Sequence, residues 1–263
     1  MTLKTIIQSY CPKSIYSGLA SAYWIVNPYR SPRAILPHDG HWRIWHVSKG
    51  TSVCVPNRRH INRGSPELRQ RKLERYTCPG FVEVEQGDTV LDIGAFVGEF
   101  AIPASKRAKR IISFEPDPFN FACLEHNTEN INNIEANKTL AWKDNETVNF
   151  SIGSDASESS AFNVDSGNVE KSVRMDGVRL DNYLIRNNTE KVDLLKLDAE
   201  GAEPQVISGL EKVYMKKIAV DCGKEYYEKS TRKKVKSILK ERGYSIQNGG
   251  KDSEGIIFGK IQP

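Results

Sequence analysis

The 263-residue chain has no apolar run that approaches the ~18 residues of a membrane-spanning helix. Its first residues lack the basic-then-apolar pattern and the small-residue cleavage site of a secretory signal, so we expect a cytoplasmic protein. With 38% apolar and 27% charged residues, the composition is that of a globular protein and not of a disordered one. A chain of this length buries roughly 70–75% of the surface that it exposes when unfolded, so its core needs no covalent or metal support.

Cysteine is scarce and scattered. There are five cysteines, an odd number, and no two of them have the Cys-x-x-Cys spacing. This pattern argues against a disulfide framework and against a structural zinc site, and it favours free thiols in a reducing compartment. The five residues are Cys11, Cys54, Cys78, Cys123 and Cys222.

The formal net charge of +5 is concentrated in two segments. Residues 58–75 contain seven Arg or Lys and two Glu, and residues 224–242 contain eight Arg or Lys and three Glu. Each segment therefore carries +5 and the remaining chain carries −5. Such segments suit an anionic partner: a phosphorylated lipid or sugar carrier, a membrane surface or nucleic acid. A solvated helix face explains them equally well.

From about residue 80, short apolar runs alternate with helical stretches, which is typical of a parallel sheet covered by helices. We expect strands at residues 89–93, 110–115, 134–142, 192–198 and 218–221. The intervening helices are expected at residues 98–107, 118–130, 203–209 and 229–242. Two last strands, 244–247 and 255–261, are joined by a polar turn and predict a hairpin that departs from a plain dinucleotide-binding sheet.

Residues 1–75 do not follow this alternation and predict a separate N-terminal cap. An amphipathic helix is expected over 3–24, followed by a β-hairpin with strands at 42–47 and 51–55. Residues 76–263 then form the α/β domain.

A glycine loop follows the first predicted strand of this domain. Asp92 stands two residues before Gly94, where a carboxylate would repel a pyrophosphate but suits the sulfonium and ammonium groups of S-adenosylmethionine. Glu115 ends the second strand, at the place where an acidic side chain accepts hydrogen bonds from ribose hydroxyls. Together with Gly98 and the terminal hairpin, this spacing predicts the mostly parallel, Rossmann-like sheet of a class I methyltransferase rather than a dehydrogenase.

Four ordered stretches resemble the FkbM-type family of S-adenosylmethionine-dependent methyltransferases. The similarity spans about residues 78–210, with Phe96 where the family commonly has asparagine and Arg179 where it has threonine. The matching stretches are residues 87–100, 114–120, 179–184 and 195–203.

This resemblance implies transfer of a methyl group to a hydroxyl, often on a sugar or a secondary metabolite. It also implies cofactor contacts for eight residues. The ribose would lie against Glu115, and the adenine near Asp117 and Ala141. The methionine end of S-adenosylmethionine would lie against the residues of the glycine loop, which are Asp92, Gly94, Ala95, Phe96 and Gly98.

Asp198 and Glu200 follow the fourth strand, at the sheet edge where ligands bind in open α/β folds. They are two residues apart in a segment taken as extended, so both carboxylates would face one cavity, with Lys196 on the same side and deeper. We expect Asp198, alone or with Glu200, to act as the base or to orient the acceptor. A divalent ion on these carboxylates is the alternative, although the sequence favours a metal-free site.

The basic segments leave two other functions open. An RNA methyltransferase would use residues 58–75 and 224–242, yet these segments lack interleaved aromatic residues and the fourth strand lacks an Asn-Pro-Pro-Tyr-type sequence. A non-catalytic cofactor-binding module would dock on an anionic membrane through the same faces. The sequence favours a small-molecule or glycan acceptor, on an anionic carrier if the basic faces take part, and it makes no prediction of oligomeric state.

Overall fold

The computed structural model describes the whole α/β region apart from short gaps, and parts of the N-terminal region. The helix expected over 3–24 lies outside the described residues except for three positions. No helix in the described part is long and apolar enough to cross a bilayer. The described residues are 17–18, 21, 33–38, 41–46, 51–57, 60, 65–153, 159–161, 169–223 and 230–261.

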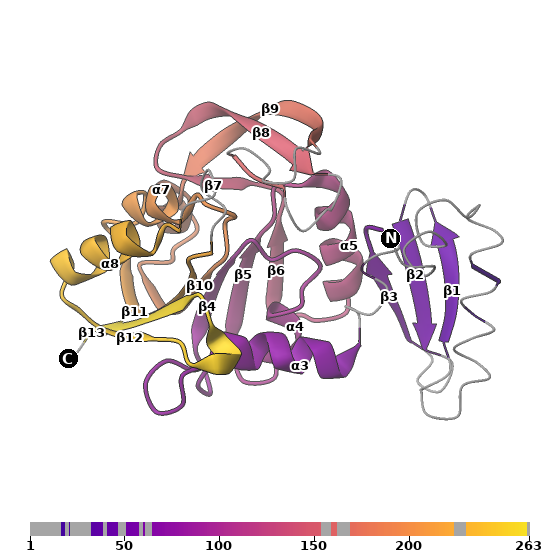
Figure 1. Cartoon of the computed structure of the whole chain (residues 1–263), viewed down its shortest axis with the longest axis horizontal. Helices are drawn as coiled ribbons and strands as arrows, with labels where there is room; N and C mark the ends of the chain where they lie inside the picture. The colour runs from indigo at the N-terminus through magenta and orange to yellow at the C-terminus, as the bar shows by residue number, and fades with distance from the viewer. Residues whose placement is uncertain are drawn as a thin grey trace.

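A seven-stranded sheet forms the centre of the molecule, in the order β12-β13-β11-β10-β4-β5-β6 (Figure 1). The five strands from β11 to β6 are parallel, and β13 runs antiparallel to both β11 and β12. This confirms the predicted Rossmann-like sheet with a C-terminal antiparallel hairpin. The strands are β4 (Thr89–Ile93), β5 (Arg110–Phe114), β6 (Ile134–Asn137), β10 (Lys191–Leu197), β11 (Tyr214–Asp221), β12 (Tyr244–Asn248) and β13 (Ile256–Ile261).

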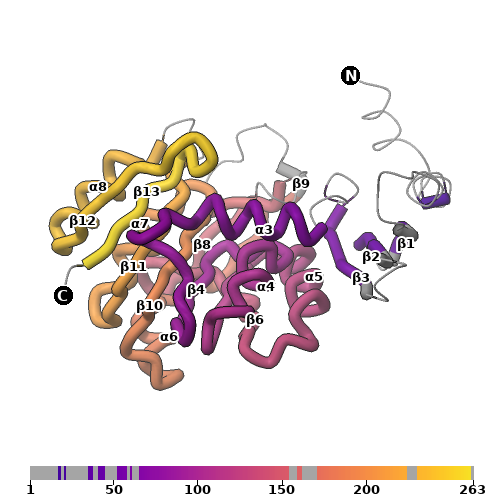
Figure 2. The backbone as a smooth tube through the Cα atoms, turned by 90° about the horizontal axis from the view of Figure 1, so that it is seen from below, coloured from indigo at the N-terminus to yellow at the C-terminus, as the bar shows by residue number. Residues whose placement is uncertain are grey.

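The central strands are buried on both faces, which explains why they appear in the sequence as nearly continuous apolar runs. One face packs against α6 (Leu180–Arg186), α7 (Glu203–Ser208) and α8 (Arg232–Glu241). The other packs against α4 (Ala101–Ala104) and the end of α3 (Pro66–Arg75), which runs along this face in Figure 2. The remaining α-helix of the described residues, α5 (Pro118–Thr128), lies beside β6, and a 3-10 turn, η3, spans Lys251–Ser253.

Two predicted elements are shorter than expected. The helix predicted over 98–107 is reduced to the four residues of α4. Its start is delayed because Gly98 has a φ of 86°, which an α-helix cannot include, and it ends at Ala104 with Ser105 as its C-cap. The strand predicted over 134–142 is two strands. After β6 the chain leaves the central sheet and continues as β7 (Leu140–Trp142) in another one.

That second sheet has the order β7-β9-β8 and lies above the central sheet in Figure 1. Its long hairpin consists of β8 (Glu146–Gly153) and β9 (Val169–Arg179), with β9 parallel to β7. The sequence analysis did not predict this sheet.

A third sheet lies in the N-terminal region and consists of β1 (Arg33–His38), β2 (His41–His46) and β3 (Thr51–Val55). The predicted hairpin is therefore confirmed in β2 and β3, and β1 is added to it. The sheet meets the rest of the molecule where β3 lies beside α5 (Figures 1 and 2). There the side chain of Asn127 accepts the Cys54 N–H at 2.7 Å and donates to the carbonyls of Cys54 and Val97 at 3.0 and 2.9 Å.

The prediction of free thiols is wrong for two of the cysteines. Cys54 on β3 and Cys123 on α5 form a disulfide. They are 69 residues apart in the sequence, and only the packing of β3 against α5 brings them together. Cys78 and Cys222 are free thiols. The expectation of a reducing compartment loses the support that it drew from the cysteine pattern.

Candidate active site

The glycine loop follows β4 and is held against both neighbouring strands. The amides of Gly94 and Ala95 donate to the carbonyl of Phe114 at 3.0 Å. Gly94 has a φ of 70°, and a Cβ built there would lie 1.8 Å from the carbonyl oxygen of Asp198, so only glycine fits. Phe96 has a φ of 52°, a conformation that asparagine adopts more readily than phenylalanine.

A buried ion pair between Lys196 and Asp92 lies beneath the glycine loop, on the side of the protein interior. Lys196 Nζ lies 3.1 Å from Asp92 Oδ1 and donates to the carbonyls of Ile93 and Gly94 at 3.2 and 2.7 Å. Burial raises the pKa of Asp92, and Lys196 opposes this rise. Burial lowers the pKa of Lys196, but the charges of Asp92 and Asp198 outweigh it and leave this pKa above its ordinary value. The ion pair therefore fixes the backbone of the loop.

Asp198 lies directly across from the glycine loop, as predicted, because β10 is the neighbour of β4. Its amide donates to the Ile93 carbonyl at 3.1 Å. Its Oδ2 accepts hydrogen bonds from Tyr76 Oη at 2.6 Å and from Lys72 Nζ at 3.3 Å. Burial alone would raise the pKa of Asp198, but the charges of Lys72 and Lys196 hold it well below its usual range. The carboxylate is therefore ionised at neutral pH.

Tyr76 and Lys72 are site residues that the sequence analysis missed. Burial, together with the charges of Asp198 and Asp221, raises the pKa of Tyr76 well above its ordinary value, so the phenol keeps its proton. Arg75, next to Tyr76, donates to Asp221 at 2.8 Å. The spacing of residues 72, 75 and 76 places all three on one face of a helix, which was the available signal. Part of the basic segment 58–75 thus pairs with acids of this protein.

The turn after β10 differs from its predicted geometry. The segment is not extended: β10 ends at Leu197, and Glu200 and Gly201 have φ values of 47° and 96°. The parity argument that placed Asp198 and Glu200 on one side is therefore wrong, although both residues do line the same pocket. Glu203 holds the turn, because its carboxylate accepts the Ala199 and Gly201 amides at 3.1 and 3.0 Å and the Thr231 hydroxyl at 2.9 Å.

Glu115 forms the wall of the site at the end of β5. Its Oε2 accepts the Phe96 amide at 2.8 Å and its Oε1 accepts the Asp117 amide at 3.0 Å. Burial, with the nearby charge of Asp117, raises the pKa of Glu115 to about 8. Asp117 itself is the N-cap of α5, where it accepts the Phe119 and Asn120 amides, and it also accepts the Ser159 hydroxyl at 2.7 Å.

One pocket gathers most of the predicted site residues at the carboxyl ends of β4, β5 and β10. Three predicted cofactor residues do not line it, because Asp92 lies beneath the loop with Lys196, Gly98 packs against Ile102 and Asp117 caps α5. The eight predicted residues that do line it are Gly94, Ala95, Phe96, Glu115, Ala141, Lys196, Asp198 and Glu200. The lining residues that the sequence analysis missed include Lys72, Glu99, Leu140, Phe150, Ser159 and Ala161.

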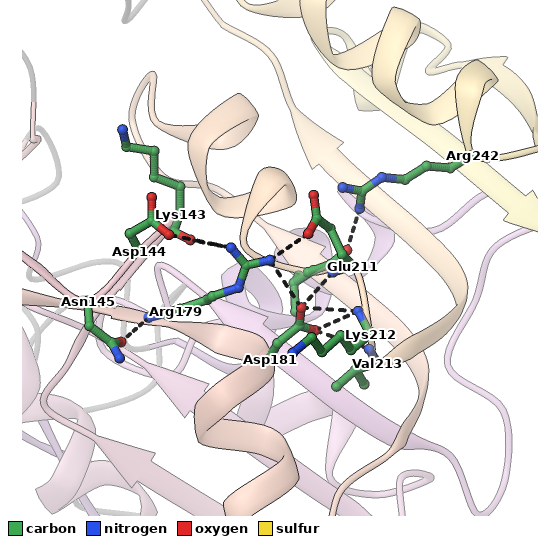
Figure 3. A network of polar contacts seen from close by, with 10 residues as sticks. Lys143, Asp144, Asn145, Arg179, Asp181, Glu211, Lys212, Val213 and Arg242 are labelled. Atoms are coloured by element: carbon green, nitrogen blue, oxygen red, sulfur yellow. Dashed lines mark hydrogen bonds and ion pairs between the residues drawn. The ribbon is translucent and has the colours of Figure 1, made fainter.

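The stretch 179–184, one of the four that carried the family resemblance, contributes no lining residue to this pocket. Its Arg179 and Asp181 belong instead to the polar network of Figure 3. Asp181 is fully buried and accepts the amides of Glu211, Lys212 and Val213 at 2.8 to 3.1 Å. Arg179 forms an ion pair with Glu211 at 2.6 Å. This motif therefore fixes the loop between α7 and β11.

Metal ligation has no support in the described ranges, where no cluster of three or more His, Cys, Asp or Glu side chains could hold an ion.

The sheet order, the antiparallel last strands and the acid-lined pocket define a methyltransferase with the class I, S-adenosylmethionine-dependent fold. The model of the Methyltransferase FkbM domain matches residues 92–246, more than half of the chain. The protein therefore belongs to the FkbM methyltransferase domain family.

Similar proteins include "Methyltransferase 1" of Beauveria bassiana, which is 24% identical over 179 residues, 60% of this chain and 72% of that protein. A solved FkbM methyltransferase of Methylobacillus flagellatus has a TM-score of 0.48 and 16% identity to this protein. The match covers 77% of this chain and 52% of the M. flagellatus chain. Aeropyrum pernix fibrillarin, solved with S-adenosyl-L-methionine bound, has a TM-score of 0.45 and 14% identity over 86% of this chain and 96% of its own.

Proposed function

We propose that the protein is an O-methyltransferase that takes its methyl group from S-adenosylmethionine and acts on a hydroxyl of a sugar, a glycan or another small metabolite. The observation that carries this proposal is the Asp198 carboxylate, which is ionised and borders the pocket beside the glycine loop. The charge of the pocket suits the donor, since Glu99 and Glu200 line it as well. Carboxylates attract a sulfonium nucleoside and repel the pyrophosphate of a dinucleotide.

The residues present fit this cofactor in three regions. The glycine loop brings backbone close to the methionine part, as Gly94 allows a close approach. Glu115 accepts hydrogen bonds from the ribose hydroxyls, and Leu140 and Ala141 offer an apolar surface to the adenine. When bound, the cofactor supplies a methyl group that is already activated on sulfur.

Asp198 orients the acceptor hydroxyl through Oδ1, since Oδ2 is engaged by Tyr76 and Lys72. Its low pKa makes it a weak base, and a weak base suffices here. An alcohol becomes strongly acidic as its oxygen bonds to the methyl carbon. The proton would therefore pass to the Asp198 carboxylate while the C–O bond forms and the methyl–sulfur bond breaks, with S-adenosylhomocysteine leaving as a neutral thioether. Glu200 lies on the same wall and is the second acceptor-binding carboxylate.

Lys196 serves in this mechanism as a positioning residue. Its ammonium group has three N–H donors, and Asp92, Ile93 and Gly94 each provide an acceptor. It holds the glycine loop at a fixed distance from β10. The sequence predicted Lys196 as a catalytic residue. Its proposed role is indirect, because it holds the glycine loop and does not contact the reacting groups.

A small acceptor is supported over RNA by the placement of the α3 cations. Arg75 is paired with Asp221, and Lys72 lines the pocket beside Asp198 and is not part of an outer basic face. The experiment is transfer of a labelled methyl group into a cell extract, followed by separation into carbohydrate, small-molecule, lipid and RNA fractions. Label in the carbohydrate or small-molecule fraction is expected, and label confined to RNA would contradict the acceptor class. Unchanged turnover after addition of a chelator would exclude the metal-dependent mechanism.

Cofactor identity is tested separately by calorimetry. We expect heat on titration with S-adenosylhomocysteine and none with nicotinamide dinucleotides. The reverse result would overturn the whole proposal.

A further inference from the structure

We infer that Lys72 binds the carboxylate of the cofactor's amino-acid group. This inference rests on the proposed function, because it assumes that the donor is S-adenosylmethionine. The donor carries a sulfonium and an ammonium group, which suit the acidic pocket, but it also carries a carboxylate. That carboxylate would be repelled by the ionised Asp198 and by Glu99 and Glu200 unless a cation faces it.

The pocket has two cations among its described lining residues, Lys72 and Lys196. Lys196 is 1% exposed and is already engaged by the ion pair with Asp92 and by the carbonyls of Ile93 and Gly94. An additional anion at Lys196 would have to displace the carbonyls that hold the glycine loop. Of these two cations, Lys72 is therefore the one that can bind the carboxylate of the cofactor.

Lys72 has unused donor capacity. Its Nζ donates one hydrogen bond within the described residues, to Asp198 Oδ2 at 3.3 Å, and an ammonium group has three donors. Its side chain is 26% exposed, so a ligand can reach it, and it extends over the ring of Tyr76 at 5.4 Å from the centroid. The α3 helix thus holds the charge in place before a ligand arrives, which reduces the entropy cost of binding.

The position of Lys72 matches the methionine end of the proposed cofactor. Asp198, its partner, has its carbonyl against Gly94. Glu115, the proposed ribose ligand, lies on the other side of the loop, where it accepts the Phe96 amide. Lys72 is therefore placed at the end of the pocket that an amino-acid group would occupy if the ribose lies at Glu115.

A second cation on the same face of α3 supports the inference. Arg69 lies three residues before Lys72 and interacts electrostatically with Glu99. Burial lowers the pKa of Arg69 to about 10, so it is still charged at neutral pH. Its charge offsets that of Glu99, and the repulsion that a carboxylate meets near Lys72 is smaller as a result.

The test removes the carboxylate from the ligand and the cation from the protein. Calorimetry compares S-adenosylhomocysteine with its decarboxylated analogue, on the wild type and on Lys72→Met. We expect the wild type to bind S-adenosylhomocysteine about tenfold or more tightly than the analogue, as for a charged hydrogen bond. Lys72→Met should lose most of this preference while binding the analogue about as well as the wild type does.

Two further variants keep the test decisive. Lys72→Arg retains the charge and should retain the preference, and Lys240→Met removes an exposed lysine of α8 and should change nothing. Equal binding of both ligands by the wild type, or equal weakening of both by Lys72→Met, would overturn the inference. Normal binding with lost turnover in Lys72→Met would also overturn it and assign the lysine to the acceptor. Absence of any S-adenosylhomocysteine binding to the wild type would instead contradict the proposed function.

Discussion

Tyr76 donates a 2.6 Å hydrogen bond to Asp198 Oδ2, across 122 residues of sequence. The bond joins the end of α3 to the carboxyl end of β10, so the helix that precedes the first strand of the sheet contributes directly to the site. Because the pKa of Tyr76 is raised and that of Asp198 lowered, the proton stays on the phenol and the charge stays on the carboxylate. This fixed arrangement is suited to orienting an acceptor.

Tyr76→Phe removes this hydrogen bond and keeps the ring, which packs edge-on against Phe100 with centroids 5.9 Å apart. A hydrogen bond to a charged group contributes about 1.5–3 kcal/mol, so we expect turnover to fall by about tenfold or more. S-adenosylhomocysteine affinity, measured by calorimetry, should be unchanged. Wild-type turnover in this variant would show that the phenol does not position Asp198.

Asp198→Asn keeps the shape of the side chain and removes its charge. We expect turnover to fall by about 10²-fold or more. The substrate hydroxyl loses the group that orients it, and its proton loses the carboxylate that would receive it. Binding of S-adenosylhomocysteine should be retained. Glu254→Gln, which changes an exposed acid in the turn before β13, is the matched control. Unchanged turnover of Asp198→Asn would remove Asp198 from the mechanism.

The raised pKa of Glu115 predicts that cofactor affinity depends on pH. Ribose hydroxyls donate to the ionised carboxylate, so binding below pH 8 must release a proton. The affinity for S-adenosylhomocysteine should rise between pH 6 and pH 8, by at most about tenfold per pH unit, and level off above. Glu115→Gln should bind more weakly and without this dependence. A flat profile for the wild type would contradict the ribose contact.

The same shift affects the unliganded protein in the opposite direction. The pKa of Glu115 is higher in the folded chain than its ordinary value of 4.5. Its contribution to stability is therefore complete below pH 4.5 and is lost as the pH rises through about 8. Glu115→Gln should weaken the decline in melting temperature over this range.

Reduction of the Cys54–Cys123 disulfide should destabilise the protein. The bridge closes a segment of 69 residues, and loop-closure entropy alone predicts a loss of about 4 kcal/mol. We expect a lower melting temperature with a reductant, and the same lower value for Cys54→Ala with or without it. Cys78→Ser, which changes a free thiol, should behave like the wild type. If the reductant did not change the melting temperature of the wild type, a stabilising Cys54–Cys123 disulfide would be contradicted.

Asp181→Ala should lower stability and leave the chemistry intact. It removes the acceptor of three backbone amides from a fully buried position, for which a loss of about 2–4 kcal/mol is expected. Chemical unfolding measures this loss. Turnover per folded molecule should match the wild type, because Asp181 lies outside the pocket. A specific loss of turnover would instead connect the loop after α7 to the site.

The central sheet could be predicted because its strands are buried on both faces and its glycine loop has a distinctive spacing. The boundaries failed where backbone conformation decides them, as at Gly98, whose positive φ delays α4, and at Glu200, which is not extended. Neither angle follows from apolar periodicity.

Within the site, residues adjacent to the motifs were predicted and those brought in from a distance were not. Lys72 belonged only to the basic segment 58–75, and Tyr76 is more typical of a core aromatic residue. Nothing in their neighbourhood indicates a partner 122 to 126 residues later. The pairing of Cys54 with Cys123 was missed for the same reason. Contacts between distant elements depend on packing that a single sequence does not display.

Asn127 bonds simultaneously to Cys54 on β3 and to Val97 in the glycine loop. One amide group thus bridges the outlying sheet and the loop that would contact the methyl donor. If a ligand that orders this loop also strengthens the attachment of β3, then by thermodynamic reciprocity the attachment of β3 strengthens ligand binding by the same factor. Protection of the β1–β3 sheet from proteolysis would then report on occupancy of a pocket to which that sheet contributes no lining residue in the described ranges.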